Sequence, residues 1–136
     1  MRILFALFLA SCCAWLQVAN VNTMKSANTI AAGTWGGEHI ALEISRNGAE
    51  IEFDCAYGQI RQPMALNAHG DFDLLGTFTP NHGGPVLRDE TPARLQARYS
   101  GHVHGDTMSL TVSLEKDKVG TFTLSRGQQP SLRKCR

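Results

Sequence analysis

The chain has 136 residues, of which 43% are hydrophobic and 18% are charged, and its formal net charge is +1. Two separate cores are rare at this length, so we expect one domain and a short N-terminal segment. A nearly neutral chain lacks the electrostatic basis for binding nucleic acid or an anionic membrane surface, so neither is expected as a partner. No phosphate-binding glycine loop precedes a helical pattern, and no cofactor is expected.

The N-terminus has the pattern of an export signal. Met1 and Arg2 precede an apolar run over residues 3–10, so we assign residues 1–19 to a signal peptide. We consider two main interpretations of its processing, lipidation and ordinary cleavage, and an uncleaved anchor as a third. Residues 9–12 resemble a bacterial lipobox, which would lipidate Cys12, whereas ordinary cleavage further on would release the protein. We therefore expect a periplasmic protein, an outer-membrane lipoprotein or a secreted protein, with membrane contact only through a lipid on Cys12.

Residues 20–33 are small and polar without periodicity, which predicts a flexible linker before a β-domain over 34–136. The first hairpin is expected to turn at Asn47-Gly48, because both residues tolerate positive φ. Centring the turn there predicts that Ile44 lies opposite Ile51. The inward-facing side chains of this hairpin are expected to be Ile40, Leu42, Ile44, Ile51, Phe53, Cys55 and Tyr57.

A second hairpin is expected to turn at Gly105-Asp106, which places Val103 opposite Met108. Further strands are expected over 60–66, 71–79 and 119–126, with a short closing strand over 131–135. Seven or eight short strands joined mostly to their sequence neighbours predict an all-β fold. We expect a single antiparallel up-and-down meander closed into a small barrel, because closure removes exposed strand edges.

Cys55 and Cys135 are the two cysteines of the predicted domain. An even number of cysteines in an exported protein favours a disulfide, so we expect this pair to be bonded. The alternatives for Cys55 are a buried free thiol and a nucleophile. A nucleophile is disfavoured, because an activated thiolate needs electropositive surroundings and Glu52 and Asp54 supply the opposite charge.

Gly33-Thr34-Trp35, just before the first strand, resembles the G-x-W start of the calycins, the lipocalin and avidin type of up-and-down barrel. In that family the Trp plugs one end of the barrel and a basic residue from the end of the chain packs on it. The resemblance implies that Trp35 is a plug and that Arg126 stacks on it through a cation–π contact. Contact of Trp35 with a ligand is the alternative. The domain also resembles small β-barrels of uncharacterised exported bacterial proteins.

His102 and His104 share one strand face near the second turn, a spacing that can chelate zinc. Structural zinc sites usually need four ligands and often use Cys, so a solvated turn is the favoured interpretation and no metal is expected.

Residues 79–93 form the one long irregular connection, and prolines stiffen it. Loops on rigid barrels commonly carry binding, and a stiff loop loses little entropy when it docks on a partner. The candidate interaction residues are Asn81, His82, Gly83, Gly84, Pro85 and Arg88. An ordered lid over one end of the barrel is the alternative interpretation.

No catalytic constellation is found in the sequence, so we expect a non-enzymatic protein of the bacterial envelope. It is expected to act through contacts with an unknown envelope or secreted protein, in the manner of an inhibitor. The alternative is a lipocalin-like carrier of a small hydrophobic ligand. Bulky inward side chains disfavour the carrier, because an eight-stranded barrel is just wide enough for its own side chains.

Overall fold

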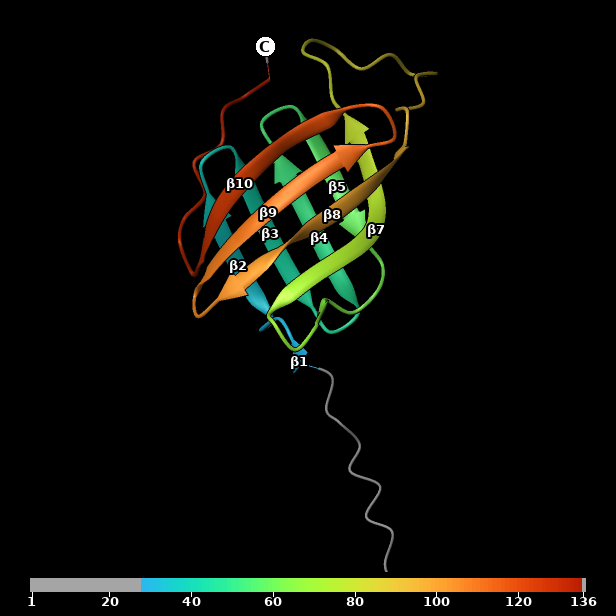
Figure 1. Cartoon of the computed structure of the whole chain (residues 1–136). Coiled ribbons are helices and arrows are strands. Elements are labelled where there is room, and N and C mark those ends of the chain that lie inside the picture. Colours follow the sequence, from blue (N-terminus) through green and yellow to red (C-terminus); the bar gives the residue numbers. More distant parts are fainter. Residues whose placement is uncertain (1–27, 136) are drawn as a thin grey trace, which may run out of the picture.

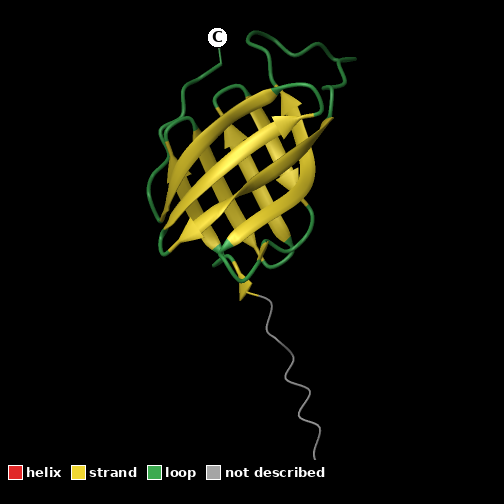
Figure 2. Ribbon diagram, viewed as in Figure 1, coloured by secondary structure: helices red, strands yellow, loops and turns green. Residues whose placement is uncertain are grey.

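The computed structural model describes residues 28–135, and within this range the fold is all-β without a helix (Figure 2). Eight antiparallel strands close into a barrel (Figure 1). In chain order the barrel strands are β2 (Gly33–Gly37), β3 (Ile40–Ser45), β4 (Gly48–Phe53), β5 (Ala56–Ile60), β7 (Asp71–Pro80), β8 (Leu95–His104), β9 (Thr107–Leu114) and β10 (Lys118–Arg126). Each barrel strand pairs with the next along the chain, and β10 closes on β2, which confirms the predicted meander.

Alternating side chains fill the interior of the barrel. The largest fully buried side chains include Trp35, Ile40, Leu42, Tyr99, Met108, Leu110, Val112 and Leu124. Strand residues of opposite parity, such as Glu43 and Glu50, face solvent. The segregation follows from the period of two along a strand, which puts every second side chain on the same face.

Within residues 28–135 no helix is both long and apolar enough to span a bilayer.

The second hairpin has the predicted register. Val103 pairs with Met108 and His104 with Thr107, so the turn consists of Gly105 and Asp106. Gly105 has a φ of 59°, the left-handed conformation that glycine adopts without steric cost.

The first hairpin keeps the predicted inward face at Ile40, Leu42, Ile44, Ile51 and Phe53, but not at Cys55 and Tyr57, which are exposed. Its register differs from the prediction by two residues. Ser45 pairs with Gly48 and Ile44 with Ala49 rather than Ile51, so the turn is Arg46-Asn47. The Ser45 hydroxyl supports this turn, because it accepts a hydrogen bond from the Asn47 N–H and donates one to the Gly48 carbonyl, both at 3.3 Å. Gly48 belongs to β4 instead, where a Cβ would lie 1.9 Å from the Ile60 carbonyl oxygen of β5.

The prediction of one strand through residue 57 is wrong, because a turn at Asp54-Cys55 separates β4 from β5. Phe53 pairs with Ala56 across this turn, which changes the parity of the residues that follow. Tyr57 therefore points outward and is 38% exposed, and Ala56 is buried in its place.

Two other predicted strands are also corrected. β5 ends at Ile60, and the expected strand over 60–66 leaves only β6 (Ala65–Leu66), which pairs with β1 (Asn28–Thr29) outside the barrel sheet. Over 131–135 only an isolated parallel bridge between Ser131 and Glu38 forms.

The part of the predicted linker that the structure describes is packed on the barrel. Ile30 is 5% exposed, and its N–H donates to the Met64 carbonyl at 2.9 Å. Met64 is itself buried. Residues 28–33 therefore close the lower end of the barrel in Figure 1 together with the segment that follows β5. Residues 20–27 and the predicted signal segment with Cys12 lie outside the described residues.

The C-terminal segment after β10 runs back along β2. Its main chain exchanges hydrogen bonds with that strand, from the Gly127 N–H to the Thr34 carbonyl at 2.8 Å and from the Ser131 N–H to the Gly37 carbonyl at 3.0 Å. Gly36 permits this approach, because a Cβ there would lie 2.1 Å from the Gln128 carbonyl oxygen. The segment ends at the upper end of the barrel, where the loop after β7 also lies (Figure 1).

Candidate functional site

The loop between β7 and β8, residues 81–94, projects from the upper end of the barrel (Figure 1). At its tip Val86 and Leu87 are each 72% exposed, more than any other large hydrophobic residue that the structure describes. Two adjacent exposed apolar side chains on a loop at the end of a rigid barrel make this loop the candidate contact surface.

Hydrogen bonds within the loop hold this tip in place. The His82 side chain contacts two acceptors, the Gly83 carbonyl through Nδ1 at 3.0 Å and the Glu90 carboxylate through Nε2. The second oxygen of Glu90 accepts the Leu87 N–H at 3.3 Å, and the Glu90 N–H donates to the Leu87 carbonyl at 3.1 Å. We call the contact between His82 and Glu90 the loop clamp, because it closes the segment that carries the exposed tip.

The clamp changes the ionisation of both partners. The Gly83 carbonyl and then Glu90 raise the pKa of His82, because both accept hydrogen bonds that favour the charged imidazolium. Hydrogen bonds from His82 and then from the Leu87 N–H lower the pKa of Glu90. Each partner therefore favours the charged form of the other.

The base of the loop is tied to the disulfide. Cys55 and Cys135 are bonded, with Cα atoms 5.0 Å apart, which confirms the predicted pairing. The Asn81 N–H donates to the Cys55 carbonyl at 2.8 Å, and the Asn81 carbonyl lies 3.7 Å from Cys135 Sγ. The first residue of the loop is thus attached to the turn between β4 and β5 and to the C-terminal segment.

A network of charged and polar groups around Asp54 lies at the same end of the barrel. Asp54 accepts a hydrogen bond from the Arg133 N–H, and its other oxygen contacts His39 Nδ1, both at 2.7 Å. The hydrogen bond from the Arg133 main chain, followed by that from His39, lowers the pKa of Asp54. His39 has a φ of 67°, the only positive value at a non-glycine residue within 28–135.

This His–Asp contact resembles the orienting half of a catalytic triad, but the described contacts of His39 include no nucleophile. Its Nε2 lies 3.3 Å from the Glu38 carboxylate instead. The network therefore acts as a brace between two turns and the C-terminal segment. The sequence contained no local signal for it, because His39 and Asp54 lie 15 residues apart.

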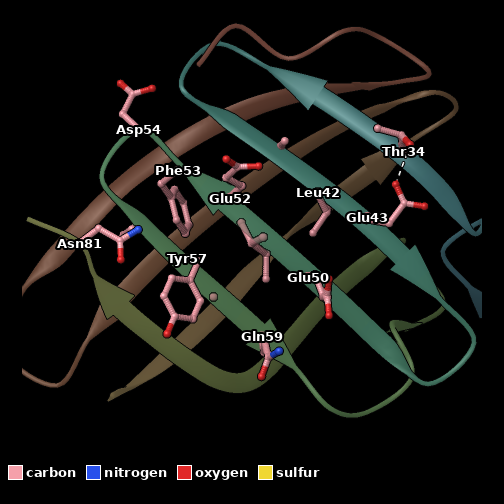
Figure 3. A pocket seen from close by; sticks show the side chains of 14 residues that line it. Thr34, Leu42, Glu43, Glu50, Glu52, Phe53, Asp54, Tyr57, Gln59 and Asn81 are labelled. Atoms are coloured by element: carbon pink, nitrogen blue, oxygen red, sulfur yellow. Dashed lines mark hydrogen bonds between the residues drawn. The ribbon is translucent and has the colours of Figure 1, made fainter. Parts of the chain in front are cut away.

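An acidic hollow of about 560 Å³ lies on the outer face of β3, β4 and β5 (Figure 3). Glu43 and Glu50 face each other across the strands, and Thr34 Oγ1 donates to Glu43 at 2.6 Å. Tyr57 and Asn81 border the same hollow (Figure 3). A second hollow of about 600 Å³ lies beneath the loop tip and shares Asn81 with the first.

The two residues predicted to plug the barrel are neighbours in register. Trp35 pairs with Arg126 between β2 and β10. The Trp35 ring is buried, and its Nε1–H donates to the Ala31 carbonyl at 3.4 Å, so it packs inside the end covered by residues 28–33. Arg126 is exposed. The stacking of its guanidinium on the indole stays a prediction.

The two histidines considered for zinc have separate environments. His102 Nδ1 contacts the Asp71 carboxylate at 2.8 Å, and this bond lowers the pKa of Asp71. His104 is exposed at the end of β8. No group of three or more potential ligands is placed to hold a metal ion within 28–135.

Comparison with protein-family models, with curated proteins and with solved structures finds no match. The closed eight-stranded barrel is compatible with the calycin architecture.

Proposed function

We propose that this chain is an exported, non-enzymatic β-barrel protein of the bacterial envelope that acts through protein contacts. Its barrel is of calycin-like type, and the loop over residues 81–94 makes the contact. The observation that carries the proposal is the tip of this loop, where Val86 and Leu87 are each 72% exposed while the loop clamp and the disulfide hold the backbone.

The energetics of the tip favour binding to a protein. Burying a Val or Leu side chain contributes about 1.5–3 kcal/mol each, and neither side chain gains this in the free barrel. A loop that is already hydrogen-bonded loses less entropy on docking than a flexible one. Two exposed apolar side chains on a pre-organised loop can therefore anchor a protein partner at a low entropic cost.

Two observations support export. A disulfide persists in oxidising compartments, and the bond between Cys55 and Cys135 closes most of the described chain. The apolar run over residues 3–10 follows a basic residue, as in a secretory signal. The partner is then expected among envelope or secreted proteins.

The filled interior disfavours the lipocalin-like carrier. Tyr99 and Met108 are 0% exposed, and Phe53 packs against Phe78 and Phe122 with ring centroids 5.3 and 5.5 Å apart. The hollows at the acidic face and beneath the loop lie outside this packed core. A carrier requires an apolar cavity of about 300 Å³ or more. Native mass spectrometry tests the alternative, since a carrier would retain lipid through purification.

The test of the proposed function is affinity capture from the envelope of the source bacterium, followed by calorimetric titration of the purified partner. The double variant Val86→Ser/Leu87→Ser is expected to lose capture and binding, because it removes both apolar anchors. Leu75→Ser is the matched control, since Leu75 is 61% exposed on the outer face of β7, away from the loop tip. Undiminished affinity of the double variant for the partner would refute the proposal.

A further inference from the structure

The two hydrogen-bond partners of the His82 ring determine its protonation state. A carbonyl oxygen only accepts, so the Nδ1 atom that contacts the Gly83 carbonyl carries a proton. The Nε2 atom faces the Glu90 carboxylate, which also accepts when it is ionised. Both hydrogen bonds therefore form together only when the His82–Glu90 pair holds one proton more than a neutral imidazole beside an ionised carboxylate, as it does when His82 is doubly protonated. Loss of that proton leaves a lone pair of Nε2 facing the negative charge of Glu90.

The surroundings of His82 leave Glu90 as the group that controls this proton. The hollow beneath the loop is lined by Pro80 from the end of β7, by Val86 and by residues 90–93, and Glu90 is its one charged side chain besides His82. From the C-terminal segment, Cys135 approaches the neighbouring Asn81 through a disulfide sulfur, which does not titrate. The other charged residues of the loop, Arg88, Asp89 and Arg94, make no ion pair in the described chain.

We propose that the loop clamp is a proton-operated switch of the contact loop, closed when His82 is doubly protonated and open when it has released the Nε2 proton to solvent. Opening also loosens the Leu87 N–H, because Glu90 holds that N–H with its second oxygen. The exposed pair at the tip then loses its fixed geometry. This inference rests on the proposed function only where it concerns binding of a partner.

The pKa shifts give the direction of the switch. The pKa of His82 is raised, so the clamp is fully present below the ordinary value of 6.5 and is lost as the pH rises through the higher pKa of the folded loop. The pKa of Glu90 is lowered from 4.5, so the clamp is also lost in acid, as the pH falls through that lower pKa. The loop is therefore closed at pH values between the lowered pKa of Glu90 and the raised pKa of His82, and it opens as the pH rises through the latter.

The switch is tested in the protein without a partner, by a pH titration of the histidine side chains and of the Leu87 amide in NMR spectra. In the native chain the Leu87 amide is expected to lose its protection from exchange over the pH range in which His82 titrates. Glu90→Gln is expected to lower the pKa of His82 and to keep the amide protected above the pH at which native His82 titrates, because the amide of Gln donates to a neutral Nε2. Asp71→Asn is the matched control, since it removes the carboxylate partner of His102 at the other end of the barrel and should leave His82 unchanged.

An unchanged His82 titration in Glu90→Gln, or a Leu87 amide that does not respond while His82 titrates, would overturn the switch. Partner binding gives a separate readout: affinity should fall as the pH rises through the His82 titration in the native chain and stay constant in Glu90→Gln. Loss of binding in Val86→Ser/Leu87→Ser together with a His82 titration that Glu90→Gln leaves unchanged would refute the switch alone. A switching loop whose apolar tip does not affect partner binding would refute the proposed function alone.

Discussion

Replacing both bonded cysteines, in Cys55→Ser/Cys135→Ser, should strongly destabilise the barrel. The bond joins positions 80 residues apart, and the chain-entropy relation for a loop of this length gives about 4.5 kcal/mol at 25 °C. Cys55 is exposed in its turn and Cys135 is half-buried, so the substitutions remove little core packing. The loss is therefore expected to come mainly from the greater freedom of the unfolded chain. Small domains are stable by about 5–15 kcal/mol, so this loss is a large share of the total.

The assay is equilibrium unfolding in urea, monitored by the fluorescence of the buried Trp35. The midpoint should fall, and the dependence of the unfolding free energy on urea should steepen, because an unfolded chain without the bond exposes more surface. The native protein with its disulfide reduced is the control and should match the double variant. A loss of less than about 1 kcal/mol with an unchanged urea dependence would refute the reasoning, because the bond would then not restrict the unfolded chain.

Three further predictions concern the core, the charged network and the C-terminal segment. Gly58→Ala should destabilise by about 1–3 kcal/mol in the same urea assay, since its Cβ would lie 2.1 Å from the Tyr99 hydroxyl oxygen, and Tyr99→Phe should relieve part of that loss. Asp54→Asn should reduce the loss of thermal stability between about pH 5 and about pH 2, because the pKa of Asp54 is lowered and its contribution disappears as the pH falls through that value. Equal losses in both proteins would contradict this. Gly36→Ala should displace the segment that contacts it at Gln128, and hydrogen exchange should then be faster at the Gly127 amide than in the native chain.

Local chemistry was sufficient to predict the second hairpin. Gly105 and Asp106 form the turn, and Val103 lies opposite Met108 as the pattern requires. The alternation of apolar and polar side chains, which depends only on the period of a strand, also predicted the closed meander. The disulfide was predicted from the even number of cysteines in a domain that is expected to fold outside the cytoplasm.

Contacts between distant residues decided what the pattern could not. Alternation leaves a register shift of two residues undetermined, since such a shift keeps the same side chains inside. At the first hairpin the close approach of Gly48 to Ile60 of β5 favours the observed register, and the local hydrogen bonds of Ser45 support its turn. The turn at Asp54-Cys55 interrupts a run that alternates without a break in the sequence, and it moves Tyr57 to the surface.

The candidate site shows the same division. The sequence by itself located the long loop after β7, because no apolar period runs through it, and it placed His82 among the candidate residues. Only the tertiary structure brought Glu90 to His82, exposed Val86 and Leu87 together, and attached Asn81 to the disulfide. The physical reason is that hydrophobic period and turn chemistry act over a few neighbouring residues. The contact between His82 and Glu90 joins groups eight residues apart, and that between Asn81 and the disulfide joins groups still further apart, so both depend on where the folded backbone places them.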